Sequence, residues 1–443
     1  MELPANGKTR EQVREEIESA LTRDADWRGG KIWSLVYFAG EDVDAVLKDA
    51  YTAALYTNGL GPGVFKSLQK FESEVLAMTA GLLGEPNAVG NTTSGGTESI
   101  LVACKAARDF ARAEKGITEP EIVLPETAHP AFTKAAQYLG MKAVRIDVGE
   151  DLRADVAEMT RSVSPNTVLI VGSAPNYPFG TIDDIPALAA LAQGHGIPMH
   201  VDACLGGFLL PFVAKLGYDV PPWNFQVPGV SSISADLHKY GFSARGASTV
   251  MYRDPAYRRH QMYAQTDWSG GLYGSPTMTG SRPGGAIAAA WAVMNYLGEE
   301  GYLRLAKVIM DTTRTIQNGI NATDGLHVLG SPAMSVFAFG SDDPAVSIHT
   351  VGDALDAKGW HPDRQSKPPA LHVMVTPAHG GVADDFIADL RDAVAKARSG
   401  EQQPSGKTAV YGGLDSMGDR GPIRDLIFGT LERMTVLESE RSG

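Results

Sequence analysis

The stretch SADLHKYG, residues 234–241, ends a β-rich run and places Lys239 between a histidine and a tyrosine. A lysine amine forms a Schiff base with a carbonyl compound when burial and neighbouring charges lower its pKa. A single lysine at a strand end is far more often an exposed residue without a chemical role. The residues that precede this stretch therefore decide between the two interpretations.

An aspartate, Asp202, closes the preceding β-rich run, IPMHVDA at residues 197–203. In open α/β sheets, ligands bind beyond the carboxyl ends of the strands. A carboxylate at that place can hold a pyridine nitrogen protonated, which makes the ring an electron sink. The alternative is an aspartate that caps the turn or helix that follows.

A glycine-rich loop, TSGGTE at residues 93–98, leads into a helical pattern. Gly95 and Gly96 let the backbone approach a ligand, and the helix N-terminus at Thr97 offers N–H groups to a phosphate. The loop is neither a Walker A motif nor a GxGxxG motif, which disfavours a nucleotide cofactor. Taken singly, it could equally be a turn that starts a helix.

A histidine, His129, follows the β-rich run EIVLP at residues 121–125. Its imidazole could stack on a flat cofactor, although a lone histidine is more often structural. The phosphate loop, His129, Asp202 and Lys239 occur in that order on successive strand–helix units. This order is the layout that a pyridoxal 5'-phosphate (PLP) site requires, so the sequence predicts a PLP enzyme with Lys239 as the Schiff-base lysine.

Strand and helix patterns alternate from about residue 60 to residue 290, and continuous apolar strands of this kind favour a mostly parallel sheet covered on both faces. The predicted strands are 121–125, 143–148, 167–174, 197–203, 231–236 and 247–253. We expect four parts: an N-terminal helix and arm (1–60), a large PLP-binding domain (61–300), a small C-terminal α+β domain (301–398), and a C-terminal arm and helix (399–443).

Composition excludes several classes of protein. The 443 residues carry a net charge of −13 and no Lys/Arg run, which argues against a nucleic-acid or anionic-membrane partner. The two cysteines, Cys104 and Cys204, form neither a disulfide framework nor a zinc motif, so no metal is expected. No apolar run approaches the roughly 18 residues that span a bilayer, and the N-terminus lacks a signal-peptide core. We expect a cytoplasmic protein without a transmembrane anchor.

Several segments together resemble one enzyme family. They are TSGGTESILVACKAARD, PEIVLPETAHPAFTKAAQYLGMK, IPMHVDACLGGFLLPF, SSISADLHKYGFSARG, TDWSGGLYGSPTMTGSRPGG and TAVYGG. The chain resembles the sphingosine-1-phosphate lyases, within the group of PLP enzymes that includes glutamate and aromatic-amino-acid decarboxylases. The resemblance implies PLP fold type I (aspartate-aminotransferase-like), a homodimer with shared active sites, and a soluble bacterial type.

The resemblance also implies roles for individual residues. Lys239 binds the cofactor and shuttles protons, Asp202 pairs with the pyridinium nitrogen, and His129 stacks on the ring. Tyr37 and Tyr411 match tyrosines that line the substrate pocket and take part in catalysis. The residues expected to hold the phosphate are Gly95, Gly96, Thr97, Ser234, His238 and Ser275, the last from the partner subunit.

Two positions depart from the family pattern. The segment Asn58-Gly59-Leu60-Gly61 has glycine, Gly61, where the family has a pocket histidine. Arg245 stands where the family has a lysine, and a guanidinium can still bind a phosphate or carboxylate bidentately. Asn58 and Arg245 are therefore expected to contact the substrate, and the missing imidazole opens the question of a different substrate.

Three functions remain open at this point. The first is a carbon–carbon lyase that cleaves the Cα–Cβ bond of a β-hydroxy amine, such as sphingosine 1-phosphate, to an aldehyde and an amine (phosphoethanolamine). The second is a PLP-dependent amino-acid decarboxylase, or a lyase for a different β-hydroxy amino substrate. The third is a non-catalytic relative, which the joint retention of Lys239, Asp202 and His129 argues against.

Overall fold

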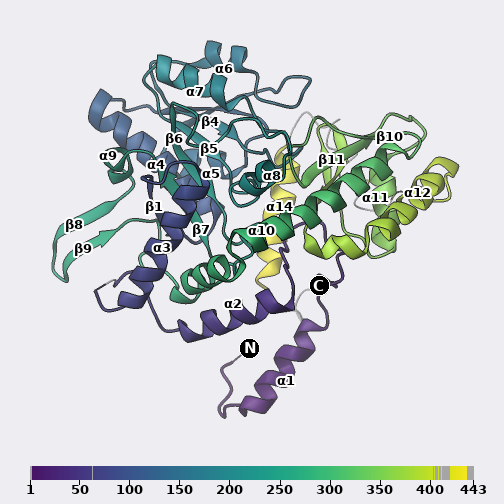
Figure 1. Cartoon of the computed structure of the whole chain (residues 1–443), viewed down its shortest axis with the longest axis horizontal. Helices are drawn as coiled ribbons and strands as arrows, with labels where there is room; N and C mark the ends of the chain where they lie inside the picture. Colours follow the sequence, from purple (N-terminus) through teal and green to yellow (C-terminus); the bar gives the residue numbers. More distant parts are fainter. Residues whose placement is uncertain are drawn as a thin grey trace.

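The computed structural model of the chain describes residues 2–61, 63–402, 404, 408, 411 and 420–436. A large α/β part contains the central sheet, and a smaller part with its own sheet lies beside it (Figure 1). The long helix α10 (Gly284–Asn321) runs between the two parts. Its axis breaks at Gly298, where φ is 54°, a conformation that glycine adopts without steric cost.

The central sheet has seven strands in the order β1-β7-β6-β5-β4-β2-β3. All neighbouring pairs from β6 to β3 are parallel, whereas β7 runs antiparallel to both β1 and β6. The strands are β1 (Val89–Thr93), β2 (Glu121–Pro125), β3 (Lys142–Ile146), β4 (Thr167–Ser173), β5 (Met199–Asp202), β6 (Val230–Ala235) and β7 (Ser248–Tyr252).

Both faces of this sheet are buried, as continuous apolar strands require. Ile170 of β4 packs into the core on one face, while its neighbour Val171 packs into the core on the other, because successive side chains point to opposite faces. The covering helices are α3 (Lys66–Leu82), α4 (Gly96–Lys115), α5 (Ala131–Leu139), α6 (Val156–Ser162), α7 (Ile185–Gly194), α8 (Leu210–Lys215) and α9 (Pro255–Arg259).

The smaller part is an antiparallel sheet in the order β10-β11-β13-β12, with its own core. Trp33 of the N-terminal arm is buried in this core, stacked on His379 with ring centroids 4.3 Å apart. The elements are β10 (Leu326–Val328), β11 (Val336–Ser341), α11 (Ile348–Ala357), β12 (Asp363–Ser366), β13 (Pro369–Met374), η1 (Pro377–Gly381) and α12 (Ala383–Ser399).

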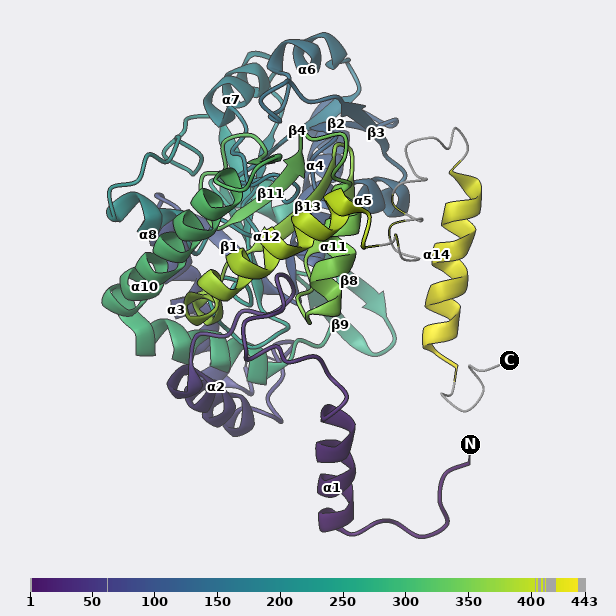
Figure 2. The same ribbon diagram turned by 90° about the vertical axis from the view of Figure 1, so that its right-hand side faces the viewer.

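Two terminal helices and one hairpin extend from the body (Figure 2). The helices α1 (Arg10–Leu21) and α14 (Gly421–Met434) contain no buried residue, whereas α2 (Glu41–Ala53) packs on α10. The hairpin β8–β9 (Tyr263–Trp268 and Gly271–Ser275) exposes most of its side chains. None of the helices in the described part of the chain is both long and apolar enough to cross a membrane.

The predicted fold class is confirmed, and every predicted strand is present within three residues of its expected ends. The sequence did not predict β1, the reversed direction of β7, or a helix α10 that begins at residue 284 and crosses the expected domain boundary after residue 300. Glycines at 284 and 285 concealed that helix start. They are required because a Cβ there would meet Thr57 and Tyr51 at less than 3.0 Å.

Candidate active site

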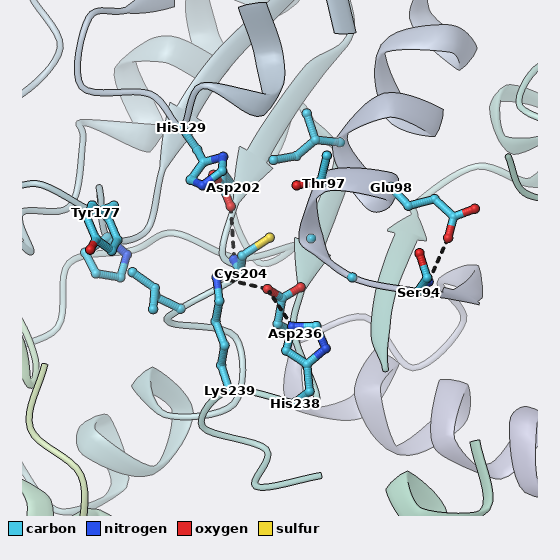
Figure 3. A pocket seen from close by; sticks show the side chains of 15 residues that line it. Ser94, Thr97, Glu98, His129, Tyr177, Asp202, Cys204, Asp236, His238 and Lys239 are labelled. Carbon is cyan, nitrogen blue, oxygen red and sulfur yellow. Dashed lines mark hydrogen bonds and ion pairs between the residues drawn. The ribbon is translucent and has the colours of Figure 1, made fainter. Parts of the chain in front are cut away.

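A cavity of about 380 Å³ lies at the carboxyl edge of the parallel strands. Loops that follow β1, β2, β4, β5 and β6 all contribute to its wall, as expected for a ligand site in an α/β sheet. Figure 3 shows the side chains converging on this space from separate loops. The lining residues are Ser94, Gly95, Gly96, Thr97, Glu98, Ile100, His129, Pro175, Tyr177, Asp202, Cys204, Leu205, Asp236, His238 and Lys239.

Lys239 extends into the cavity from the loop after β6, and its Nζ lies 3.0 Å from Oδ2 of Asp236 (Figure 3). Asp236 is 1% exposed, so this is a buried ion pair. Burial, the largest single effect, lowers the pKa of Lys239, but the negative charge around the ammonium, that of Asp236 first, together outweighs burial and raises the pKa above its usual range. The amine is therefore protonated at neutral pH in the protein without cofactor.

Asp202 ends β5 and is 7% exposed. Its Oδ1 accepts hydrogen bonds from the backbone N–H of Cys204 at 3.1 Å and from the hydroxyl of Ser234 at 3.4 Å. These two donors fix the orientation of the carboxylate at the cavity wall. Asp202 therefore does more than cap the turn that follows it, because the same side chain also faces the cavity.

His129 lies in the loop between β2 and α5, and its Nδ1 accepts the backbone N–H of Ala131 at 3.1 Å. Because Nδ1 accepts, the ring is neutral with its proton on Nε2. Burial lowers the pKa of His129 further, although the charge of Asp202 opposes this effect. A neutral, fixed imidazole of this kind presents a flat face to the cavity.

The glycine loop and His238 form the other end of the cavity. A Cβ on Gly96 would meet Cys204 Sγ at 2.7 Å, and a Cβ on Gly95 would meet His238 at 3.3 Å. The absence of side chains at both positions keeps the first turn of α4 open, and its N–H groups face the cavity. Nδ1 of His238 accepts the N–H of Ala247 at 3.2 Å, which directs Nε2 toward Asp236, 3.7 Å away.

These residues fit PLP. An open helix N-terminus suits a phosphate, the flat face of His129 suits a ring, and the hydrogen-bonded Asp202 suits a pyridine nitrogen. The amine of Lys239 lies in the same cavity, where it can reach an aldehyde. The glycine loop thus offers a phosphate-binding site at one end of the cavity. Each of the other groups is complementary to one part of the cofactor.

A family model described as "Pyridoxal-dependent decarboxylase conserved domain" matches residues 1–341. The sphingosine-1-phosphate lyase of Arabidopsis thaliana is 46% identical over 426 residues, which cover 94% of this chain and 78% of the plant protein. A structure of the sphingosine-1-phosphate lyase of Burkholderia pseudomallei has a TM-score of 0.90 at 40% identity, covering 98% of this chain and 97% of that one. The chain belongs to the sphingosine-1-phosphate lyase family.

Membership in the sphingosine-1-phosphate lyase family establishes PLP as the cofactor and a lyase as the class of enzyme. A more distant relative, described as a probable L-aspartate decarboxylase of Pyrococcus furiosus, is 34% identical over 81% of this chain and 94% of its own length. The glutamate decarboxylase of Lactobacillus brevis shares the fold, with a TM-score of 0.78 at 20% identity. The expected fold and cofactor are confirmed.

Tyr37 and Arg245 lie together in a second cavity of about 410 Å³ that shares His238 with the first. The Arg245 guanidinium lies 5.4 Å from the centroid of the Tyr37 ring, a cation–π distance. Burial raises the pKa of Tyr37 to about 12, which keeps its phenol protonated. Leu35 and Phe242 in the same wall have φ of 68° and 56°, and strain of this kind concentrates at functional sites in proteins.

Ser234 does not line the cavity, contrary to the expectation that it contacts the phosphate. It is fully buried, and its hydroxyl lies against Asp202, 3.2 Å from Nε2 of His200 and 3.3 Å from Sγ of Cys204. The reason is its position inside β6, where its hydroxyl is directed toward residues of the neighbouring strand β5. Ser234 therefore orients Asp202, and its contact with the phosphate stays a prediction.

Ser275 and Asn58 also lie outside the cavity of their own chain. Ser275 Oγ donates to the carbonyls of Thr277 and Thr279, and Asn58 Nδ2 donates to Ser281 at 2.9 Å. Both residues therefore belong to one loop region beside the β8–β9 hairpin. The contact of Ser275 with the phosphate of a partner subunit stays a prediction, as does the contact of Asn58 with substrate.

Tyr411 is described, although most residues around it are not, and its ring lies 5.7 Å from that of His349 on α11. This places it against the small part and not in the wall of either cavity. The expectation that Tyr411 lines the pocket is therefore not met within one chain. The C-terminal arm approaches α11 because Thr408 contacts Asp353 there.

The sequence did not assign roles to Asp236 and Tyr177, which both line the cavity. Tyr177 follows β4, stacks on His372 with ring centroids 4.3 Å apart, and donates from its phenol to Asp363 at 2.9 Å. Both partners come from the small sheet. The position of Tyr177 just beyond a strand end could have indicated a site residue. Asp236 lies three residues before Lys239 in the sequence, and that spacing could have indicated a contact with the lysine.

Proposed function

We propose that this chain cleaves the Cα–Cβ bond of a phosphorylated long-chain β-hydroxy amine of the sphingosine 1-phosphate type. The products are a long-chain aldehyde and phosphoethanolamine. Identity of 40–46% with proteins named sphingosine-1-phosphate lyase, over nearly the whole chain, carries this substrate assignment. The cavity residues fit the chemistry that such a cleavage requires.

PLP, when bound, supplies an electron sink for the bond that breaks next to the substrate amine. Lys239 attaches the cofactor and moves protons, and Asp202 holds the ring nitrogen protonated. His129 would stack on the ring and exclude water from it. Gly95, Gly96 and Thr97, together with His238, bind the phosphate.

On the substrate side, we assign the β-hydroxyl proton to Lys239, whose amine lies in the cavity beside Asp236. Tyr177 is fixed by Asp363 at 2.9 Å and presents a protonated phenol to the substrate. Arg245 and Tyr37, in the neighbouring cavity, are placed to receive an anionic group. Arginine is suited to that role since it presents a planar fork of donors to phosphate oxygens.

A single assay tests the substrate and the outcome of the reaction. Purified enzyme is incubated with sphingosine 1-phosphate, with β-hydroxy amino acids and with L-aspartate, and aldehyde, amine and CO2 are measured. We expect aldehyde and phosphoethanolamine in equal amounts from sphingosine 1-phosphate. The likeness to a probable L-aspartate decarboxylase makes that activity the second candidate, and CO2 release without aldehyde would favour it.

We also propose a homodimer whose active sites are shared. Ser275 and Asn58 lie outside the cavity of their own chain, next to the protruding β8–β9 hairpin. This region exposes large apolar side chains, among them Tyr56 at 92% and Leu272 at 84%, and patches of this kind mark interaction sites. Sedimentation should give twice the chain mass, and Leu272→Glu should shift the equilibrium to monomer with loss of activity.

The cytoplasmic location expected from the sequence stays a prediction. Cell fractionation tests it, since activity should stay in the supernatant after membranes are removed. Activity that sediments with the membranes would contradict it.

A further inference from the structure

Asp236 is a buried carboxylate with an unusual environment. It is 1% exposed, and although burial opposes the shift, side-chain contacts with Lys239 and Ser248 lower the pKa of its carboxyl group. Its close neighbours are the ammonium Nζ of Lys239 at 3.0 Å and the imidazole Nε2 of His238 at 3.7 Å. A carboxylate is costly to bury unless its charge is paired, and the ammonium that pairs with Asp236 in the cavity wall is that of Lys239.

We propose that Asp236 is the counter-ion of Lys239: it holds the free ε-ammonium in one position in the cavity until the lysine loses its proton and attaches the cofactor. The inference rests on the proposed PLP chemistry of Lys239. Asp236 is a positioning residue in this proposal, because it acts through the lysine.

The proton balance is simple. The ammonium of Lys239 gives one proton to water, which leaves a neutral amine beside the carboxylate of Asp236. The amine then adds to the aldehyde carbon of the cofactor, and one water leaves. Without Asp236, the buried ammonium loses the carboxylate 3.0 Å away that stabilises its charge most, so the amine loses its proton at a lower pH.

Other ionisable groups face Lys239 from every side of the cavity. Asp236 comes first in strength among the charges that raise the lysine pKa. The remaining neighbours are Asp202 and Cys204 after β5, Tyr37 of the N-terminal arm, His129 after β2, Tyr177 after β4, and His238 and Arg245 after β6. Asp202 also carries negative charge, but its oxygen accepts from Cys204 and Ser234 and is not the partner at 3.0 Å.

The first experiment uses the full chain stripped of cofactor with hydroxylamine. PLP is added at saturating concentration, and the first-order rate of the Schiff-base absorbance band is measured from pH 6 to pH 10. In Asp236→Asn we expect the midpoint of the pH profile to fall by at least about one unit, since an opposite charge at this distance shifts a pKa by roughly that much or more. Superimposable profiles for the two proteins would overturn the proposal.

Asp183→Asn is the matched control. Asp183 is also 1% exposed and lies in the same part of the chain, but it accepts the backbone N–H groups of Ala154 and Ser173 and does not line the cavity. Its variant should keep the pH midpoint of the unmodified protein. An equal shift in this control would mean that the loss of any buried carboxylate gives the effect, and the proposal would fail.

A second measurement needs no variant, so it stands even if Asp236→Asn does not fold. The stripped, unmodified protein is labelled with an amine-reactive reagent across the same pH range, and Lys239 is compared with the exposed Lys142 by peptide mapping. Lys239 should begin to react at a higher pH than Lys142. Reaction at the same or lower pH contradicts the role of Asp236, whereas a PLP label on a different lysine contradicts the proposed function itself.

Discussion

Ser234 and Asp202 are partners across the parallel strands β6 and β5, and the serine Oγ lies 3.4 Å from the aspartate Oδ1. The strand pairing itself therefore sets the orientation of the carboxylate that meets the cofactor ring. This relationship explains why two residues that are 32 positions apart act as one unit, and it separates the electronic role of Asp202 from the geometric role of Ser234.

Asp202→Asn should still bind PLP but lose at least ~100-fold in kcat, about 3 kcal/mol in the barrier. An amide cannot hold the ring nitrogen protonated, so the electron sink weakens. Ser234→Ala is the comparison, because it removes one hydrogen bond and leaves the charge; its loss should be ~10-fold or less. Steady-state kinetics and cofactor absorbance measure both effects, and a near-normal kcat in Asp202→Asn would reduce Asp202 to a turn cap.

Lys239→Ala should abolish turnover and the Schiff-base absorbance band while the protein stays folded. The reason is the position of its amine in the cavity, where no other lysine of the described chain lines the wall. Borohydride reduction followed by peptide mapping checks the assignment in the unmodified protein. The pyridoxyl group should be found on Lys239, and circular dichroism of the variant should match that of the parent.

Gly61→His should be tolerated by the fold, because a Cβ at Gly61 meets nothing within 4 Å and its φ is not positive. If the missing imidazole limits activity on sphingosine 1-phosphate, the variant should raise kcat/KM on that substrate and hinder a shorter native one. Gly61 is not in the cavity wall of its own chain, so any effect should also require the dimer. Equal kcat/KM in the two proteins would make Gly61 a neutral difference.

Tyr177→Phe should lower kcat by ~10-fold or more without changing PLP binding, because it removes the hydroxyl of a cavity-lining residue and leaves the ring that stacks on His372. Asp363→Asn, which keeps an acceptor for the phenol, is the conservative comparison and should have a smaller effect. Cofactor titration followed by absorbance measures PLP affinity separately from kcat. A change in PLP affinity with unaltered kcat would argue against a role in the reaction.

His379 should make folding stability depend on pH between about 7.5 and 4. Burial lowers its pKa to about 4, below the unfolded value of about 6.5. A depressed pKa means that the stabilisation is complete above the unfolded pKa and is lost as pH falls through the folded one. Between pH 7.5 and 5 we expect a loss of about 2 kcal/mol from this residue, measured by urea denaturation. His379→Gln should flatten that part of the pH profile, even if it lowers stability throughout.

The sequence by itself determined the fold class and the identity of the central groups. Continuous apolar strands in alternation with helices can be buried only in a parallel sheet covered on both faces, so the strand positions were predictable. Lys239, Asp202 and His129 each follow a strand, and parallel strands bring their carboxyl ends to one edge. Their meeting in one cavity was therefore predictable from order alone.

Tertiary structure alone decided which polar residues face the cavity. Ser234 points into the sheet and Tyr411 lies against α11, whereas Asp236 and Tyr177 line the wall. These orientations depend on strand register and on contacts between residues far apart in the chain, such as the bond from Tyr177 to Asp363 across 186 positions. The local sequence pattern does not predict such contacts, because the direction of a side chain at a strand end depends on the residues that pack against it.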